Sequence, residues 1–307
     1  MILTLISLQF QGERANSRFM GIWGTLLTAS TLFGFCSVAE PIFPAPTPAP
    51  QNSWSQVSGP AAGSPNVIGF YSAGCIRGAQ QLAPEGTGYQ SMRLSRNRQY
   101  GHPTLVDFIA GLAQRADSLG SALLISDLGQ ARGGPMPYGH SSHQVGLDAD
   151  IWFWTHPEQR TRSLSLEERD NLPMISMLNA NGIVDAKRFG PEQILKLKLA
   201  SLSPEVERIF VNPAIKTYLC SALEESELSW LNKLRPWPGH HEHFHVRIRC
   251  PEGSAECVSQ EAPPPGDGCN ELLPPRRKFF VKSEENPWLE RFHDHTFPEA
   301  CTKLLKE

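Results

Sequence analysis

Histidine and aspartate side chains gather in two short stretches of the chain that lie far apart in sequence. GHSSHQVGLDADIW contains two histidines and two aspartates, and PWPGHHEHFHVRIRC contains four histidines within six positions. The residues concerned are His140, His143, Asp148, Asp150, His240, His241, His243 and His245. Zinc readily accepts imidazole nitrogen and carboxylate oxygen as ligands, and three protein ligands with one open position form a catalytic site. A lone histidine is usually an ordinary core or surface residue, but two His/Asp clusters favour a metal site.

The second stretch formally matches His-Glu-x-x-His, the zinc-peptidase signature that requires a helix. Here a proline-rich run (PWPG) precedes the histidines, and apolar residues then alternate with polar ones up to a cysteine. That alternation predicts a half-buried strand instead of a helix. In a strand, His241 and His245 lie ~13 Å apart, too far to bind one ion, whereas His243 and His245 share a face ~6.6 Å apart. We therefore expect one of the latter pair to bind the metal and the other to carry protons beside it.

The first stretch supplies the remaining ligands. A strand predicted over residues 147–154 places Asp148 and Asp150 on the same face. We expect His143, Asp150 and His245 to form a three-ligand zinc site. Zinc lowers the pKa of bound water to ~7, which would provide a nucleophile at neutral pH. Asp148 is expected either to orient a histidine or to occupy a turn.

The composition indicates a folded protein with a sizeable core. The chain has 307 residues, of which 40% are hydrophobic, and a formal net charge of -3. This length predicts ~1–2 domains. Acidic and basic residues are interspersed and form no basic stripe, so we expect no nucleic-acid partner.

The N-terminal residues 1–39 have the pattern of an export signal. Arg14 and Arg18 precede an apolar run over residues 20–35, and Ser-Val-Ala at 37–39 is a small-x-small cleavage pattern. Either Met1 or Met20 is the start. An uncleaved membrane anchor is the alternative, but the apolar run is short for a span, so we expect export without stable membrane insertion.

Proline-rich stretches divide the rest of the chain. Residues 40–58 form a proline-rich linker, residues 59–251 the folded domain, and residues 252–307 a proline-rich tail attached through its cysteines. Periodicity predicts helices starting at Pro103 and over residues 165–180, 191–200 and 213–223, and strands over residues 122–126 and 206–211.

Six cysteines remain after removal of the signal: Cys75, Cys220, Cys250, Cys257, Cys269 and Cys301. An even count in an exported chain predicts three disulfides. Cys250 and Cys257 are close enough to bridge locally, whereas spacing leaves the other pairings open. A cysteine zinc site is disfavoured because no Cys-x-x-Cys pair exists.

Longer segments of the sequence resemble those of a known protein family. RGGPMPYGHSSHQVGLDADIW, RIFVNPAIKTYLC, RPWPGHHEHFHVRIRCP and PPPGDGC resemble the penicillin-insensitive murein endopeptidases, within the zinc-peptidase group of lysostaphin, D-Ala-D-Ala peptidases and hedgehog domains. The resemblance implies a periplasmic α+β protein with a small, mainly antiparallel sheet flanked by helices, stapled by disulfides. It also implies a zinc enzyme that cuts D-alanyl-meso-diaminopimelyl cross-links in peptidoglycan, with homodimerisation left open.

The resemblance assigns roles to individual residues. It makes His143, Asp150 and His245 zinc ligands, His140 a further metal contact, His243 the general base or transition-state stabiliser, and His240 a second histidine of the cleft. It pairs Cys75 with Cys301, Cys220 with Cys269, and Cys250 with Cys257. The chemistry of guanidinium groups also makes Arg132 and Arg247 candidates for binding peptide carboxylates. Unlike family members with an additional metal, the chain has no histidine in NANGIV at residues 179–184.

Three alternatives remain open to experiment. A non-haem iron oxygenase also uses two histidines and one carboxylate, although with a different spacing. A peptidoglycan-binding domain could retain the metal without catalysis, and a carboxypeptidase of the same group would release terminal D-alanine. Metal analysis distinguishes an iron oxygenase from a zinc enzyme. Analysis of digestion products distinguishes an endopeptidase from a binding domain and from a carboxypeptidase.

Overall fold

A computed structural model describes residues 50–270 and 295–307 of the chain. All described residues belong to one compact unit that begins at Ala49, and the preceding unit, Met1–Pro48, lies outside them. The predicted signal, most of the linker, and residues 271–294 of the predicted tail are therefore not described, and the predicted domain boundaries stay predictions. Among the described helices, none is long and apolar enough to cross a membrane.

The centre of the described unit is a seven-stranded sheet in the order β10-β9-β11-β8-β7-β5-β4. Four of its strand pairs are antiparallel and two, β10–β9 and β5–β7, are parallel, so the sheet is mixed. Its strands are β4 (Glu85–Gly86), β5 (Tyr89–Ser91), β7 (Leu123–Ile125), β8 (Asp148–Trp152), β9 (Val206–Val211), β10 (Leu234–Pro236) and β11 (His243–Ile248). Two small antiparallel pairs, β1 (Asn66–Phe70) with β2 (Ala73–Arg77) and β3 (Gln80–Gln81) with β6 (Tyr100–Gly101), stand outside it.

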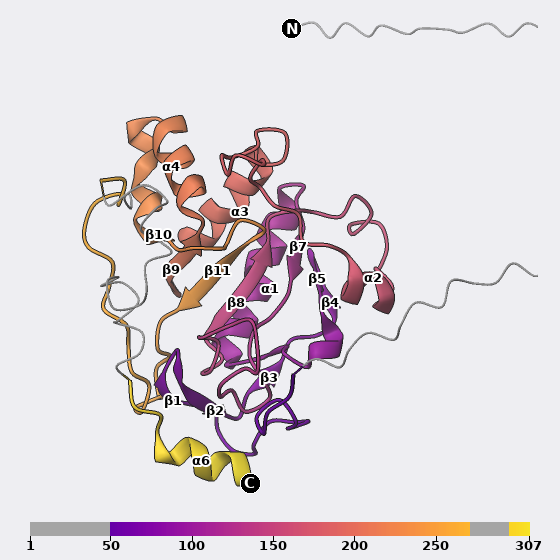
Figure 1. Ribbon diagram of the computed structural model, residues 1–307, viewed down its shortest axis with the longest axis vertical. Coiled ribbons are helices and arrows are strands. Elements are labelled where there is room, and N and C mark those ends of the chain that lie inside the picture. Colours follow the sequence, from indigo (N-terminus) through magenta and orange to yellow (C-terminus); the bar gives the residue numbers. More distant parts are fainter. Residues whose placement is uncertain (1–49, 271–294) are drawn as a thin grey trace, which may run out of the picture. The chain divides into compact units, whose positions relative to one another are not determined.

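The described helices lie around this sheet, except for α6, which packs against β1 and β2 (Figure 1). They are α1 (Pro103–Ser118), α2 (Leu166–Asn171), α3 (Pro191–Ser201), α4 (Pro213–Ala222) and α6 (Glu299–Lys306), with 3₁₀ turns η1 (Leu94–Arg96) and η2 (Glu225–Lys233). α1 starts where its sequence predicts, because Pro103 occupies its first turn and the His102 ring accepts the Thr104 N–H at 3.2 Å. Its apolar face joins one large core with β5, β7, β8, β9 and β11. The α+β class is confirmed.

Alternation along β8 and β11 separates the core from a polar face. Ala149 and Ile151 of β8, and Phe244, Val246 and Ile248 of β11, belong to the hydrophobic core. In a strand the intervening residues point to the opposite face, which places the aspartates of β8 and the histidines of β11 together. The predicted strand over the second histidine stretch is confirmed, and the helical reading of His-Glu-x-x-His is excluded.

Three disulfides join distant parts of the chain, and each pairing that the resemblance implies is confirmed. Cys75 of β2 binds Cys301 of α6, so the C-terminal helix lies beside the β1–β2 hairpin (Figure 1). The remaining bridges are Cys220–Cys269 and Cys250–Cys257.

Most predicted elements lie where their patterns indicate. The strand at Val206–Val211 matches its predicted range, and α3 and α4 match theirs within a residue. The helix predicted over residues 165–180 was too long, because α2 ends at Asn171. Pro173 explains the early end, since a proline disfavours helical backbone in the residue before it.

Candidate metal centre

The register between β8 and β11 places the candidate ligands side by side. His245 pairs with Asp150, and Arg247 pairs with Asp148, across adjacent antiparallel strands. His143 lies in the loop before β8 with a backbone φ of 67°, a left-handed conformation that non-glycine residues rarely adopt. The His143 N–H donates to Asp148 Oδ2 at 3.0 Å, which holds the loop against the strand.

The three predicted zinc ligands converge on one point. His143 Nε2 lies 3.4 Å from Asp150 Oδ1 and 3.2 Å from His245 Nδ1. His245 Nδ1 lies 3.5 Å from the same Asp150 oxygen. All three residues are buried. The structure therefore brings together three potential ligand atoms from a loop and two strands, within reach of one ion.

The hydrogen-bonding of these atoms fits a cation between them. His143 Nδ1 lies 2.6 Å from the Leu128 carbonyl oxygen, and a carbonyl only accepts, so Nδ1 carries the proton and Nε2 presents a lone pair. His245 Nε2 lies 3.0 Å from Asp148 Oδ1, which leaves Nδ1 facing the centre. Asp150 Oδ1 is buried and has no hydrogen-bond partner among the described residues. Three electron-rich atoms so close together favour a bound metal ion.

Two further histidines face the other oxygen of Asp150. His140 Nε2 and His243 Nε2 each lie 3.6 Å from Asp150 Oδ2. His140, His143 and Asp150 also form a group whose ligand atoms lie within 4.8 Å of one another. However, His140 Nε2 lies closer, at 3.0 Å, to Asp127 Oδ2. The arrangement therefore favours the Oδ1 side for the ion and the Oδ2 side for histidines that act beside it.

Asp127 is the residue of this centre that sequence reasoning missed. Its Oδ2 accepts hydrogen bonds from Arg96 at 2.9 Å and Arg98 at 3.0 Å in addition to its contact with His140. Burial opposes ionisation, but His140 and the two arginines hold the pKa of Asp127 below its usual range. The sequence feature that could have identified it is an aspartate two residues after the buried strand β7 (Leu123–Ile125).

The two aspartates of β8 are both ionised. Burial opposes ionisation of Asp150, yet the surrounding histidines, His243 first, hold its pKa well below the usual range for aspartate. Burial also opposes ionisation of Asp148, and the adjacent Arg247 guanidinium outweighs it and keeps the pKa of Asp148 low. Two negative charges are therefore buried in this face of the sheet.

Three histidines of this centre have pKa values below the usual range for histidine. Burial lowers the pKa of His245 to about 4 and that of His240 to about 3, and it also lowers the pKa of His243. Burial opposes protonation of His143 too, but the Asp150 carboxylate raises its pKa. Neutral imidazoles can bind a metal or accept a proton, and a bound cation would favour the neutral form of His143 as well.

A cavity of about 270 Å³ opens beside these residues. Its walls come from residues 139–142, before β8, and residues 237–240, before β11, together with His243, His245 and Arg247. The ring centroids of His240 and His243 lie 5.1 Å apart, and Phe210 and Trp237 make an edge-to-face contact on the same wall. The cavity is lined by His140 and His243, the two histidines that face Asp150 Oδ2.

The two predicted substrate-binding arginines lie in different surroundings. Arg247 lines the cavity, but its guanidinium is engaged by Asp148 through Nε at 2.7 Å. Arg132 donates to the carbonyl oxygens of Leu304 and Leu305 in α6, so it caps the C-terminal helix. Substrate binding by either arginine stays a prediction.

Comparison with known proteins points to one family. The profile of the family described as penicillin-insensitive murein endopeptidase matches residues 67–306. The chain is 41% identical over 260 residues to the penicillin-insensitive murein endopeptidase of Klebsiella pneumoniae (strain 342), covering 83% of this chain and 91% of the relative. It is 44% identical over 259 residues to that of Yersinia enterocolitica, covering 82% and 90%. The Haemophilus influenzae protein of the same name is 38% identical over 253 residues, covering 81% and 84%.

Proposed function

The chain belongs to the family of penicillin-insensitive murein endopeptidases, and on that basis we propose that it is a zinc enzyme for D-alanyl-meso-diaminopimelyl cross-links. The family makes it a metallopeptidase that acts on peptidoglycan. The zinc ion and the particular bond are our proposal. The observation that carries it is the buried Asp150 Oδ1, which has no hydrogen-bond partner in the described part of the chain and lies 3.4 and 3.5 Å from two imidazole nitrogens.

We assign the metal to His143 Nε2, Asp150 Oδ1 and His245 Nδ1. Nitrogen and oxygen donors in this number match a catalytic zinc site with one position left for substrate or water. A zinc ion there would supply a Lewis acid that polarises the scissile carbonyl and lowers the pKa of an attacking water. Asp148 and Leu128 hold the two imidazoles in the orientation that presents their lone pairs.

The remaining histidines act on protons and charge in the cavity. The lowered pKa of His243 keeps its imidazole neutral at pH 7, so the ring can take a proton during attack and return it to the leaving amine. His240, neutral on the cavity wall, can donate a hydrogen bond to negative charge developing on the carbonyl oxygen. His140 stands beside Asp150 Oδ2 and is held by Asp127. We propose it as a further contact to the metal or its water.

The proposed location is the periplasm. Three disulfides are typical of an oxidising compartment outside the cytoplasm, and the pattern of residues 1–39 supports export. Peptidoglycan is reached in the same compartment. Insensitivity to penicillin follows from the chemistry, because a β-lactam requires a serine to acylate and the sequence contains no Ser-x-x-Lys.

Digestion of a defined substrate tests this function. Purified cross-linked muropeptide dimers are incubated with the protein and analysed by mass spectrometry, with and without a chelator, and after adding zinc back. We expect dimers to become monomers, chelator to stop the reaction, zinc to restore it, and penicillin to leave it unchanged. Free D-alanine without monomers would instead identify a carboxypeptidase, and intact dimers with bound zinc would identify a binding domain.

A further inference from the structure

A short segment between two disulfide-bonded cysteines crosses the molecule near the proposed metal centre. We call residues 258–268 the strap, because Cys257 precedes it and Cys269 follows it. Cys257 is bound to Cys250, just after β11, and Cys269 is bound to Cys220 in α4. The Val258 N–H also donates to the Gly69 carbonyl of β1 at 3.0 Å. The strap is therefore fixed at both ends.

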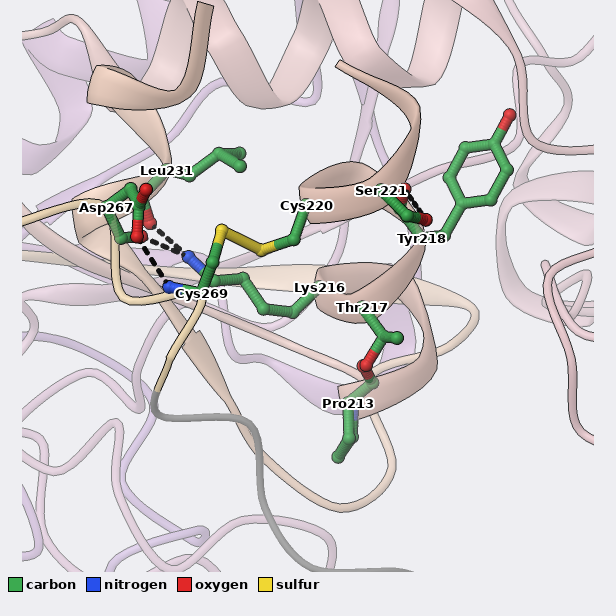
Figure 2. The surroundings of a disulfide bond; sticks show 9 residues. All are labelled: Pro213, Lys216, Thr217, Tyr218, Cys220, Ser221, Leu231, Asp267 and Cys269. Atoms are coloured by element: carbon green, nitrogen blue, oxygen red, sulfur yellow. Dashed lines mark hydrogen bonds between the residues drawn. A yellow bond between two sulfur atoms is a disulfide. The ribbon is translucent and has the colours of Figure 1, made fainter. Parts of the chain in front are cut away.

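Side chains of the domain hold the strap along its length. Arg208 of β9 donates to the Glu261 carbonyl oxygen. Asn232 donates to the Pro264 carbonyl oxygen at 2.7 Å and also to that of Gly266. Figure 2 shows the far end, where Lys216 of α4 donates to the Asp267 carbonyl oxygen at 2.6 Å, next to the Cys220–Cys269 bridge. These bonds define the position of the strap over β9, η2 and α4.

One strap side chain reaches toward the metal centre. Gln260 is half-buried, and its Oε1 accepts a hydrogen bond from Arg247 Nη1 at 2.7 Å. Two other nitrogens of the same guanidinium bind Asp148. Nε donates to Oδ1 at 2.7 Å, and Nη2 donates to Oδ2 at 3.1 Å. The guanidinium is buried and lies over the Tyr71 ring at 4.0 Å. Gln260 and Asp148 thus hold opposite ends of one planar group.

Asp148 also contacts two of the proposed metal ligands, His143 and His245. Its Oδ2 accepts the His143 N–H at 3.0 Å, and its Oδ1 lies 3.0 Å from His245 Nε2. A carboxylate in close contact with the far nitrogen of a ligating histidine helps to set the orientation of the ring and the basicity of the ligand nitrogen. A rotation of Asp148 would therefore change the direction of the His245 lone pair.

From this chain of contacts we propose that Gln260 is a positioning residue for the metal centre, acting through Arg247 and Asp148 on His245. The proposal rests on the proposed function, because it concerns the zinc site assigned there. Without the Gln260 oxygen, Arg247 Nη1 loses its hydrogen-bond acceptor. Because the guanidinium group is planar and rigid, a rotation that gives Nη1 a new acceptor moves the whole group. That turn displaces the Asp148 carboxylate. The strap thereby contributes to zinc affinity from outside the cavity.

Three variants of the full mature protein separate positioning from general support. Gln260→Met keeps the length and removes the acceptor, and Gln260→Glu restores an oxygen acceptor. Asn232→Ala removes two other bonds to the strap without touching Arg247. The readout is the zinc dissociation constant of each protein, measured by competition with a chromophoric chelator, together with the visible spectrum of the cobalt-substituted protein and thermal melting to verify folding.

We expect Gln260→Met to weaken zinc binding about 3- to 10-fold, less than the 10- to 100-fold typical of a direct partner of a ligand. Its cobalt spectrum should shift, whereas Gln260→Glu and Asn232→Ala should keep the wild-type affinity and spectrum. A wild-type affinity in Gln260→Met, or an equal loss in Asn232→Ala, would overturn the positioning role. Failure of the wild-type protein itself to bind zinc would overturn the proposed function, and this inference with it.

Discussion

Asp148 and Asp150 lie two positions apart on β8 and point to the same face of the sheet, yet their surroundings differ in kind. Asp148 is fully buried, and the guanidinium of Arg247 binds both of its oxygens. Asp150 is also buried, but its near neighbours are imidazoles, and its Oδ1 has no hydrogen-bond partner among the described residues. The charge of Asp148 is balanced by Arg247 of the same chain, whereas we propose that the charge of Asp150 is balanced by a metal ion from solution.

This difference explains how two adjacent charges can serve separate purposes. A buried ion pair stabilises a structure only when its geometry is satisfied, and removal of one partner leaves an uncompensated charge. Asp148 and Arg247 meet that condition and form a rigid support. In the proposed site Asp150 would gain its counter-charge from the metal ion, because its ion-pair contacts among the described residues are imidazoles instead of an arginine or a lysine.

The largest effect is expected from Asp150→Asn. The change removes the negative ligand, so we expect zinc affinity to fall at least ~100-fold and cleavage of muropeptide dimers to fall at least ~1000-fold. The zinc-free protein should lose less stability than with Asp148→Asn, because imidazoles surround Asp150 whereas Asp148 is the buried partner of a guanidinium. Zinc titration, dimer digestion and urea unfolding measure the three quantities. A strongly destabilised zinc-free variant would break the contrast with Asp148.

His243→Ala probes the Oδ2 side of Asp150. We expect one equivalent of zinc to remain, while kcat falls about 100- to 10,000-fold, the usual contribution of a general acid–base residue. His245→Ala is the matched comparison, since it should lose zinc as well as activity. Metal analysis and dimer digestion of both variants provide the test. Equal zinc content and full activity in either variant would show the roles to be wrongly assigned.

Asp148→Asn should act mainly on folding. Arg247 would keep its buried charge without a carboxylate, so we expect the free energy of unfolding of the zinc-free protein to fall by about 3–5 kcal/mol. The double variant Asp148→Asn with Arg247→Met should recover part of that loss because it removes both charges. Urea unfolding of the zinc-free proteins measures the loss. If Asp148→Asn leaves the free energy of unfolding unchanged, Asp148 has no greater role in folding than Asp150.

Removal of the Cys220–Cys269 bridge tests how far the support of Asp148 extends. Serine at both positions should lower the free energy of unfolding by about 2–5 kcal/mol, as for other native disulfides. It should also weaken zinc binding, because the strap that carries Gln260 is freed at one end (Figure 2). Thermal melting and zinc titration measure the two effects. Unchanged zinc affinity would confine the role of this bridge to stability.

The smallest effect concerns a buried cation elsewhere in the molecule. Burial lowers the pKa of Lys196 to about 8, and Glu192 at 3.4 Å offsets this only in part. Between pH 8 and 10 the unfolded chain holds this proton more tightly than the folded one, so stability rises with pH. We expect wild type to gain about 1–2 kcal/mol relative to Lys196→Met across that range. A parallel pH dependence of the two proteins would contradict the low pKa.

Local patterns predicted a large part of the fold and of the site. Apolar alternation identified β11 and thereby put His243 and His245 on one face, and a buried apolar run at residues 122–126 identified β7. Proline in the first turn identified the start of α1. These features depend on neighbours in sequence, which is why a single chain reveals them.

Other features depend on contacts between distant segments. The pairing of Arg247 with Asp148 follows from the register of β8 against β11. Gln260 reaches Arg247 from the strap, which two disulfides and several hydrogen bonds hold in place. No periodicity in the sequence records either contact. Arg132 is a further example: the chemistry of its guanidinium group made it a candidate for substrate binding, and in the fold it donates to carbonyl oxygens at the end of α6.

The most direct test of the metal centre is an anomalous difference map from a zinc-soaked crystal, with data on both sides of the zinc absorption edge. We predict one strong peak at about 2.0–2.2 Å from each of His143 Nε2, Asp150 Oδ1 and His245 Nδ1. A peak bound instead by His140 Nε2 and Asp150 Oδ2, away from His245, would contradict the assignment.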